Sequence, residues 1–289
     1  MPISFPNELR YAVCPLCGAS TIVKIGVISY GQPVLFSSVE VRVERVPELW
    51  KCNGCGSAFV QNVLPEELAR KLYAEGDSTS RWSTAVFECH KPHEIIAELS
   101  RLCQNGRQHL DVGCGEGNLL DFSRERGCIT TGIDYSITTK ERLELKGHTW
   151  FSSFEQLGAK EFDIITAFDV IEHLYEMRRF FDECYRRLKP GGRLVLLTGD
   201  IDCQSSRSTQ TRWWYVGYPE HIAFPSRKFF EGLSNFKIER WIPTYASVAY
   251  QFPFYRKVLS CMKRIVTMKK YNGMPSWSPD HVLIVLAKE

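Results

Sequence analysis

Four cysteines form two matched pairs whose spacing is typical of metal binding. Each pair has the form Cys-x-x-Cys followed by glycine, and 34 residues separate the pairs. Such a turn points two thiolates at one ion, and two turns complete a tetrahedral Zn²⁺ site with no open ligand position. A redox pair is the alternative, which the presence of two matched pairs disfavours. The sequence therefore predicts a structural zinc site formed by Cys14, Cys17, Cys52 and Cys55.

A glycine-rich segment follows a short apolar run in the middle of the chain. A strand is predicted over 108–112, glycine occupies every second position of 113–117, and a helix is expected from Asn118. Asp134 ends the next expected strand, 21 residues after Gly113, where an acid commonly holds ribose hydroxyls. Acids on both sides of the glycines would repel a pyrophosphate and attract an ammonium or sulfonium. The pattern predicts a nucleoside-containing cofactor, whereas a glycine turn alone often serves packing.

Four segments resemble, in the same order, the motifs of the class I S-adenosylmethionine-dependent methyltransferases. They are Leu110–Gly117, Thr131–Ser136, Phe162–Leu174 and Leu188–Leu196. The resemblance implies an α/β fold with a Rossmann-like, seven-stranded methyltransferase sheet, here with a small N-terminal zinc-ribbon domain. It also implies S-adenosyl-L-methionine as the cofactor.

The resemblance assigns cofactor contacts residue by residue. The three glycines are expected to line the methionine part, Asp111 to face its amino group, Asp134 to hold the ribose hydroxyls, and Tyr135 to pack on adenine. The predicted cofactor-binding residues are Asp111, Gly113, Cys114, Gly115, Gly117, Asp134, Tyr135, Phe168 and Asp169.

Histidines supply the candidate general bases, because imidazole titrates near neutral pH. His221 is the first candidate. It is the last residue of an aromatic segment, 212–221, which is predicted to form a wall of the substrate pocket. The alternative is that this segment is a lid that only packs on the helical linker. His173 is the second candidate. Asp169, Glu172, His173 and His221 also resemble the metal ligands of two methyltransferase families, the ubiquinone-pathway O-methyltransferases and the small-RNA 2′-O-methyltransferases, although Asp replaces Glu at the first position.

Three regions follow from the positions of these motifs. Residues 1–62 are the expected four-cysteine zinc ribbon, residues 63–107 a helical linker and substrate cap, and residues 108–289 the methyltransferase domain, with insertions at 199–225 and 244–279. Within the ribbon, alternating runs over 21–30 and 38–46 are expected to pair as a hairpin. Within the linker, helices are expected from Pro65 and from His93 to Cys103.

Composition limits the class of protein. The chain has 289 residues, 44% of them hydrophobic, and a formal charge of +3, which excludes a disordered or highly charged chain. Eleven cysteines cannot all pair within one chain, and no secretory signal or membrane-length apolar run is evident. We therefore expect a soluble cytoplasmic protein in a reducing compartment.

The predicted function is methyl transfer to a small-molecule acceptor. The ribbon followed by this domain looks like sugar and natural-product methyltransferases, which implies O- or N-methylation of a sugar, a polysaccharide precursor or a natural product. The alternative is an RNA methyltransferase whose ribbon docks RNA, which the low net charge disfavours. A non-enzymatic interaction protein is disfavoured by the intact motifs. The basic segment 256–270 predicts either a solvated helix or weak contact with a membrane surface, and the sequence does not define the oligomeric state.

Overall fold

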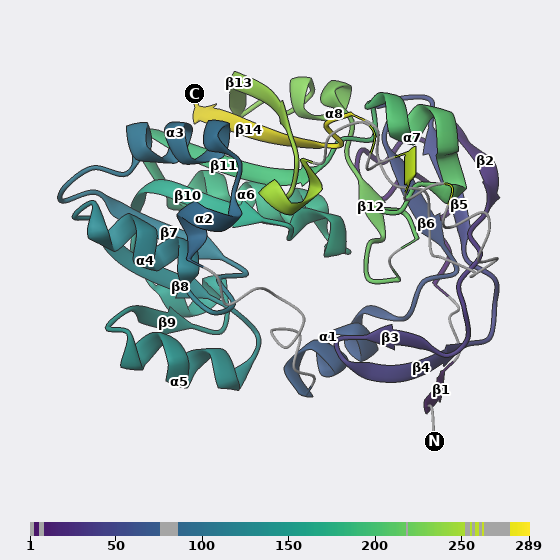
Figure 1. Cartoon of the computed structure of the whole chain (residues 1–289), viewed down its shortest axis with the longest axis horizontal. Helices are drawn as coiled ribbons and strands as arrows, with labels where there is room; N and C mark the ends of the chain where they lie inside the picture. The colour runs from purple at the N-terminus through teal and green to yellow at the C-terminus, as the bar shows by residue number, and fades with distance from the viewer. Residues whose placement is uncertain are drawn as a thin grey trace.

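A seven-stranded sheet forms the centre of the molecule (Figure 1). The computed structural model describes residues 3–5, 9–75, 86–217, 219–251, 255, 258, 259, 262 and 278–289. The strand order is β13-β14-β11-β10-β7-β8-β9. The strands are β7 (Gln108–Val112), β8 (Ile129–Ile133), β9 (Thr149–Phe151), β10 (Phe162–Phe168), β11 (Leu188–Gly199), β13 (Phe236–Thr244) and β14 (His281–Lys288). The predicted Rossmann-like methyltransferase sheet is thereby confirmed.

The sheet is parallel from β9 to β11 and antiparallel at β14 and β13. Strands β10, β11 and β14 are apolar on both faces, as expected for strands that helices cover on both sides. Helices α3 (His93–Leu102) and α4 (Asn118–Glu125) pack on one face, and α6 (Met177–Arg187) and α8 (Arg227–Glu231) pack on the other. The carboxyl ends of β7, β8 and β10 therefore meet at one edge, where a ligand site is expected.

The remaining helical segments are short or lie on connections. They are α2 (Phe87–His90), α5 (Ile137–Leu145) and α7 (Gln204–Thr209), with the 3₁₀ turns η2 (Phe154–Leu157), η3 (Ile171–His173), η4 (Gln210–Arg212) and η5 (Val248–Tyr250). Helix α4 begins directly after Gly117, which has φ of 74°. This start at Asn118 was expected from the sequence.

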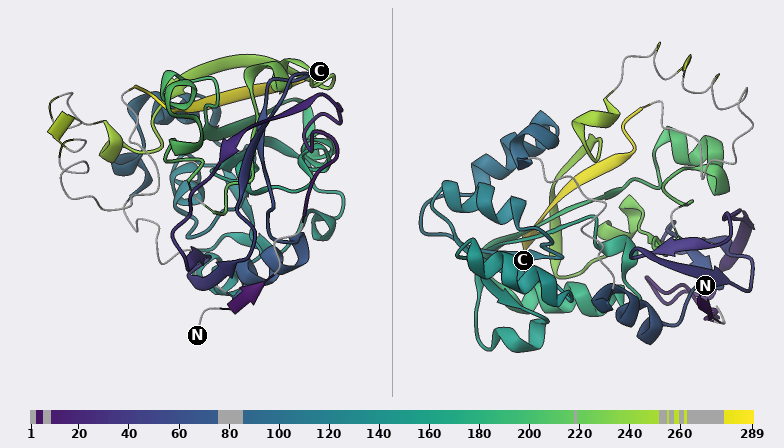
Figure 2. Two further views of the ribbon diagram at one scale, coloured as in Figure 1. Left: turned by 90° about the vertical axis from the view of Figure 1, so that its right-hand side faces the viewer. Right: turned by 60° about the horizontal axis from the view of Figure 1, so that its bottom comes forward.

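The N-terminal region builds a second, four-stranded sheet in the order β12-β6-β5-β2 (Figure 2). Its strands are β2 (Ile22–Val27), β5 (Glu48–Cys52), β6 (Ala58–Gln61) and β12 (Ala223–Phe224). Strand β12 comes from the insertion after β11, and its Ala223 lies opposite Phe59 of β6. The insertion thus completes the sheet of the ribbon.

The predicted hairpin between 21–30 and 38–46 is wrong. Strand β2 pairs with β5, whereas β4 (Val39–Val43) pairs with β3 (Val34–Phe36) and with β1 (Ile3–Phe5). Alternating apolar residues predict a strand but not its partner, and the partner here is the strand that carries Cys52. The three-stranded sheet packs instead on α1 (Glu66–Glu75), with Val41 against Leu72 in one apolar cluster.

The ribbon and the seven-stranded sheet share one apolar core. Leu16 of the ribbon belongs to the same buried cluster as Trp213, Phe224 and Phe181 of the C-terminal region. Arg178 of α6 donates from Nε to the carbonyl of Leu16 at 3.1 Å. The ribbon is therefore packed on the domain that it precedes.

Two further expectations concern membranes. Over the described ranges, the structure contains no helix with the length and apolarity needed to cross a bilayer. The basic segment 256–270 lies, except for residues 258, 259 and 262, outside the described residues.

Candidate functional site

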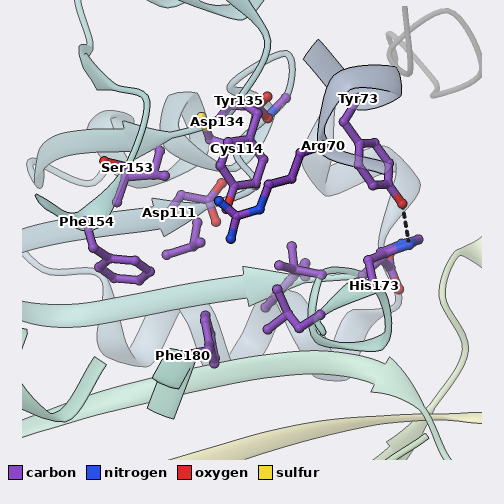
Figure 3. A pocket seen from close by; sticks show the side chains of 18 of the residues that line it. Arg70, Tyr73, Asp111, Cys114, Asp134, Tyr135, Ser153, Phe154, His173 and Phe180 are labelled. Atoms are coloured by element: carbon purple, nitrogen blue, oxygen red, sulfur yellow. Dashed lines mark hydrogen bonds between the residues drawn. The ribbon is translucent and has the colours of Figure 1, made fainter. Parts of the chain in front are cut away.

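A cavity of about 430 Å³ opens at the carboxyl ends of β7, β8 and β10 (Figure 3). Its floor is the segment from Asp111 to Glu116, and its sides are Asp134 with Tyr135 and Phe168 to Val170. Helix α1 closes the opposite side with Arg70 and Tyr73. The volume lies in the range of small-molecule sites, and the lining joins the predicted cofactor loop to the N-terminal region.

The glycine loop leaves room that a side chain would occupy. Gly113, Gly115 and Gly117 all have positive φ, between 46° and 74°. A Cβ on Gly113 would lie 2.5 Å from Val170, whereas a Cβ on Gly115 would meet no atom within 4 Å. Gly115 therefore borders open space in the cavity, as a position does where a ligand approaches the backbone.

Two carboxylates flank this loop with little access to water. Asp111 is buried at the end of β7 and accepts a 2.6 Å hydrogen bond from Thr166 Oγ1. Burial raises its pKa to about 7, against the opposing effect of that hydrogen bond. Asp134 accepts from the backbone N–H groups of Gly115 and Ser136, yet burial raises its pKa as well. A bound cation would favour the ionised form of both groups.

Sequence analysis missed a buried relay that holds Asp111. Because Thr166 Oγ1 donates to Asp111, it accepts from His109 Nε2 at 2.9 Å. The other ring nitrogen of His109 therefore accepts from Ser123 Oγ at 2.8 Å. Both His109 and Thr166 are fully buried, and burial lowers the pKa of His109 to about 3, so the imidazole is neutral. His109 and Thr166 lie on neighbouring strands and belong to no recognisable sequence motif, so the sequence did not indicate that they meet.

Of the predicted cofactor residues, all except Gly117 line the cavity. Cys114 is a buried residue of the loop, Phe168 ends β10, and Asp169 follows it. Tyr135 is 52% exposed, with the Arg70 guanidinium 5.9 Å from its ring centre. An exposed aromatic ring at the rim can stack on a planar group.

The two candidate histidines occupy different positions. His173 lines the cavity, and His221 does not. His173 Nδ1 lies 2.9 Å from the carbonyl oxygen of Glu220 and 3.1 Å from Tyr73 Oη. A carbonyl only accepts, so Nδ1 carries the hydrogen and Nε2 of the neutral ring has the lone pair. Of the two candidates, His173 is therefore the one at the cavity, whereas the sequence ranks His221 first.

His221 belongs to a buried cluster behind the cavity. Its Nδ1 donates to the carbonyl of Tyr215 at 2.8 Å, and burial lowers its pKa well below the usual range. Tyr215 Oη in turn donates to Glu172, whose other oxygen accepts from Thr198 Oγ1 at 3.0 Å. The aromatic segment 212–221 therefore packs partly inside the fold: Trp213 and Tyr215 are fully buried.

Ligand atoms of Glu172, His173 and His221 lie within 4.8 Å of one another. This set is three of the four residues that resembled a metal site; Asp169 lies outside it. Donors from Tyr215 and Thr198 already occupy both oxygens of Glu172. Glu172 is therefore a buried carboxyl group with a hydrogen bond to each oxygen.

The four ribbon cysteines converge on one point. Their sulfur atoms lie within 4.8 Å of one another; Cys14 and Cys55 are 3.9 Å apart, and Cys17 and Cys52 3.6 Å. Tetrahedral Zn²⁺ with bonds of about 2.3 Å places its sulfurs about 3.8 Å apart. The donor set and its spacing therefore fit a structural zinc ion.

Comparison with known proteins gives one family. A protein-family model described as a methyltransferase domain matches residues 87–235 of this chain. A ubiquinone biosynthesis O-methyltransferase of Coxiella burnetii is 30% identical over 153 residues, which cover 48% of this chain and 63% of that protein. One of Idiomarina loihiensis is 29% identical over 180 residues, covering 56% and 69%. The chain thus matches less than two thirds of the length of the Coxiella protein.

Solved structures agree on the fold. A chain from the complex between a methyltransferase activator and a methyltransferase of Haloferax volcanii superposes with a TM-score of 0.50. The superposition covers 68% of this chain and 90% of that one, at 14% identity. At this identity the likeness concerns the fold alone.

Proposed function

The chain belongs to the methyltransferase-domain family, and from this premise we propose that it transfers a methyl group from S-adenosyl-L-methionine to a hydroxyl or amine of a small molecule. The observation that carries the proposal is the cavity, which joins the glycine loop to a wall formed by α1 and His173. A sugar, a polysaccharide precursor or a natural product is the proposed acceptor class. An acceptor that binds in the cavity between the glycine loop and α1 must be compact, which fits a small molecule better than a polymer.

The residues present fit the cofactor. When bound, S-adenosylmethionine supplies an activated methyl group on a sulfonium. Asp111 and Asp134 supply negative charge to a cationic ligand, and the open space at Gly115 admits it against the backbone. The relay through Thr166 fixes the orientation of Asp111 before the cofactor arrives. Alignment of this kind accounts for much of the rate in methyl transfer.

Two cavity groups are available to receive the proton of the acceptor. One is His173, through Nε2, and the other is the carboxylate of Asp169. His221 is a positioning candidate, because its ring packs 4.8 Å from that of His173 between ring centres. The proposed mechanism needs no metal ion at Glu172, His173 and His221. Turnover that persists after divalent ions are removed with a chelator would support this, and loss of turnover would contradict it.

We further propose that Cys14, Cys17, Cys52 and Cys55 hold a structural zinc ion. The sulfur spacing supports this, and a closed four-thiolate site has no open position for catalysis. Strand β6 leads from the second cysteine pair to α1, and Ser226 after β12 donates from Oγ to the carbonyl of Cys55 at 2.5 Å. The ion would therefore fix the part of the chain that walls the acceptor side.

The alternative of an RNA substrate is less well supported. Nine acidic and three basic residues line the cavity, a balance that repels phosphate. We expect S-adenosylmethionine to bind in calorimetry, and methyl-labelled cofactor to label at least one member of a small-molecule panel. The panel contains methyl hexosides, their 2-amino counterparts, phenols and anilines; total RNA is the parallel sample. Label in RNA alone would refute the small-molecule proposal, and failure to bind the cofactor at millimolar concentration would refute methyl transfer itself.

A further inference from the structure

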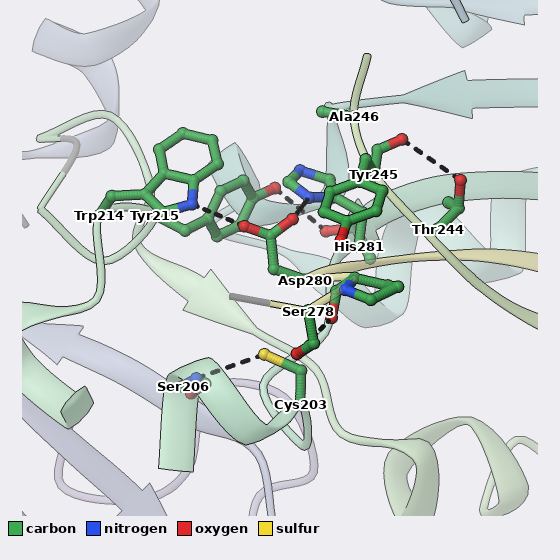
Figure 4. A network of polar contacts seen from close by, with 12 residues as sticks. Cys203, Ser206, Trp214, Tyr215, Thr244, Tyr245, Ala246, Ser278, Asp280 and His281 are labelled. Carbon is green, nitrogen blue, oxygen red and sulfur yellow. Dashed lines mark hydrogen bonds and ion pairs between the residues drawn. The ribbon is translucent and has the colours of Figure 1, made fainter. Parts of the chain in front are cut away.

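A buried histidine stands behind the cavity at the start of β14 (Figure 4). His281 is 1% exposed, and its Nδ1 donates to Asp280 Oδ1 at 2.8 Å. The other oxygen of Asp280 accepts from Trp214 Nε1 at 2.6 Å. Because these contacts fix the ring, they also fix where its second nitrogen points.

That second nitrogen faces Asp169. His281 Nε2 lies 3.8 Å from Asp169 Oδ1, and among the described residues neither buried atom has a hydrogen-bond partner. Asp169 Oδ2 lies 3.6 Å from Lys91 Nζ. The Asp169 carboxylate therefore lies between Lys91 and His281, within 4 Å of each but without a hydrogen bond to either. Unsatisfied buried polar atoms are costly, and they are often found at functional sites.

Asp169 also stands next to the cofactor loop. It follows β10 with φ of 54°, a left-handed conformation that is uncommon outside glycine. A methyl of its neighbour Val170 would lie 2.5 Å from a Cβ on Gly113, so the side chain next to Asp169 packs directly on the loop. The Asp169 side chain lines the cavity at this point. A strained residue here is placed where the acceptor must approach the cofactor.

We propose that Asp169 binds the reacting hydroxyl of the acceptor and receives its proton, and that His281 and Asp280 are positioning residues that hold Asp169. This proposal rests on the proposed function and deepens it: the acceptor is a hydroxyl compound, and the product is an O-methyl ether. The acceptor oxygen bonds to the methyl carbon as the carbon–sulfur bond breaks, and that electron pair stays on sulfur. The hydroxyl proton passes to the Asp169 carboxylate. Because the oxygen becomes strongly acidic as the new bond forms, a carboxylate is a sufficient base.

The local charges favour a hydroxyl over an ammonium. Burial opposes a charge on His281, but the hydrogen bond and charge of Asp280, with Asp169, raise its pKa above the usual range. When His281 is protonated, it and Lys91 balance the two carboxylates of Asp280 and Asp169. A neutral hydroxyl preserves this balance, whereas an additional cation would be repelled by both basic groups.

Two other acids that line the cavity are paired with arginines. Glu66 pairs with Arg70 at 2.6 Å, and Glu176 pairs with Arg179 at 3.0 Å. Asp111 and Asp134 belong to the cofactor part. The basic groups described within 4 Å of the Asp169 carboxylate are Lys91 and His281, and both would repel a protonated amine.

The test combines product analysis with a double-mutant cycle. With the panel and methyl-labelled cofactor, methyl should appear on oxygen, as located by mass spectrometry and NMR. With the labelled hydroxyl compound, Asp169→Asn should lower kcat by about 10²–10⁴-fold, and His281→Gln by about 10–100-fold. The double variant should fall no further than Asp169→Asn alone, because His281 acts through Asp169. Cofactor affinity in calorimetry should stay within about threefold in the His281 variant.

Controls separate this role from structural damage. His148→Gln removes another buried imidazole paired with a carboxylate, Asp121 at 3.0 Å, but outside the cavity, and should leave kcat unchanged. If His281→Gln fails to fold, Trp214→Phe, which removes the donor to Asp280 and keeps an aromatic ring beside His281, replaces it in the cycle. Methyl on nitrogen only, no methylated hydroxyl compound, or additive losses in the cycle would overturn the proposal. A protein that binds no cofactor would instead contradict the proposed function.

Discussion

The affinity for S-adenosylmethionine should depend on the ionisation of Asp111. Burial raises the pKa of this carboxyl to about 7 in the free protein, and a cationic ligand binds the ionised form. The ionised fraction is about 0.09 at pH 6 and about 0.76 at pH 7.5, so the apparent Kd should fall about eightfold over this interval. The α-amino group of the ligand, with a pKa of about 7.7–8.0, loses roughly a third of its protons by pH 7.5, which reduces the expected change to about five- to sixfold. Asp134, whose pKa burial also raises, adds to the change in the same direction.

Calorimetric titrations at pH 6.0, 6.5, 7.0 and 7.5 measure this dependence, and buffers of different ionisation enthalpy report the proton released on binding. Thr166→Val removes the hydrogen bond that lowers the pKa of Asp111, so the curve should move to higher pH. Thr130→Val is the matched control on β8, on the other side of β7 from Thr166; its hydroxyl contacts His148 instead of Asp111. An affinity that is constant from pH 6 to 7.5, or that strengthens toward acid, would refute the assignment of Asp111 to a cationic ligand.

Three further outcomes are expected. Cys52→Ser should lower Tm by roughly 5–10 °C through loss of a structural metal ligand, whereas the exposed Cys89→Ser should not; equal Tm values would contradict the zinc site. Gly115→Val should weaken cofactor binding at least about tenfold, while Gly158→Val, at a similar positive φ with equally open space, should not; equal affinities would place the cofactor elsewhere. Titration with total RNA at 0.15 M salt should show no binding tighter than about 1 μM, and a tighter complex would revive the RNA alternative.

The cofactor half of the site could be predicted from the sequence. Strand β7, the glycine loop and the start of α4 lie where expected, because their signals are local: an apolar run, glycines at alternate positions and a helix start. The acid after β8 was found by its distance along the chain from Gly113. These features are set by residues that are neighbours in the sequence.

The acceptor half could not be predicted in the same way. Strand β12 has two residues and pairs with β6, more than 160 positions earlier, so no periodic pattern marks it. Lys91 and His281 meet Asp169 only after three distant segments pack together. His221 was preferred over His173 because it closes an aromatic segment, and only tertiary packing shows that this segment turns Tyr215 inward.

A crystal structure of the protein with S-adenosylhomocysteine is the most direct test of the central claim, that the cavity beside the glycine loop is a methyltransferase cofactor site. The account predicts the ribose hydroxyls on Asp134, the homocysteine part along residues 113–117, and the sulfur on the side of the cavity that Asp169 lines. Density for the ligand outside this cavity, or an empty cavity at millimolar ligand, would contradict it.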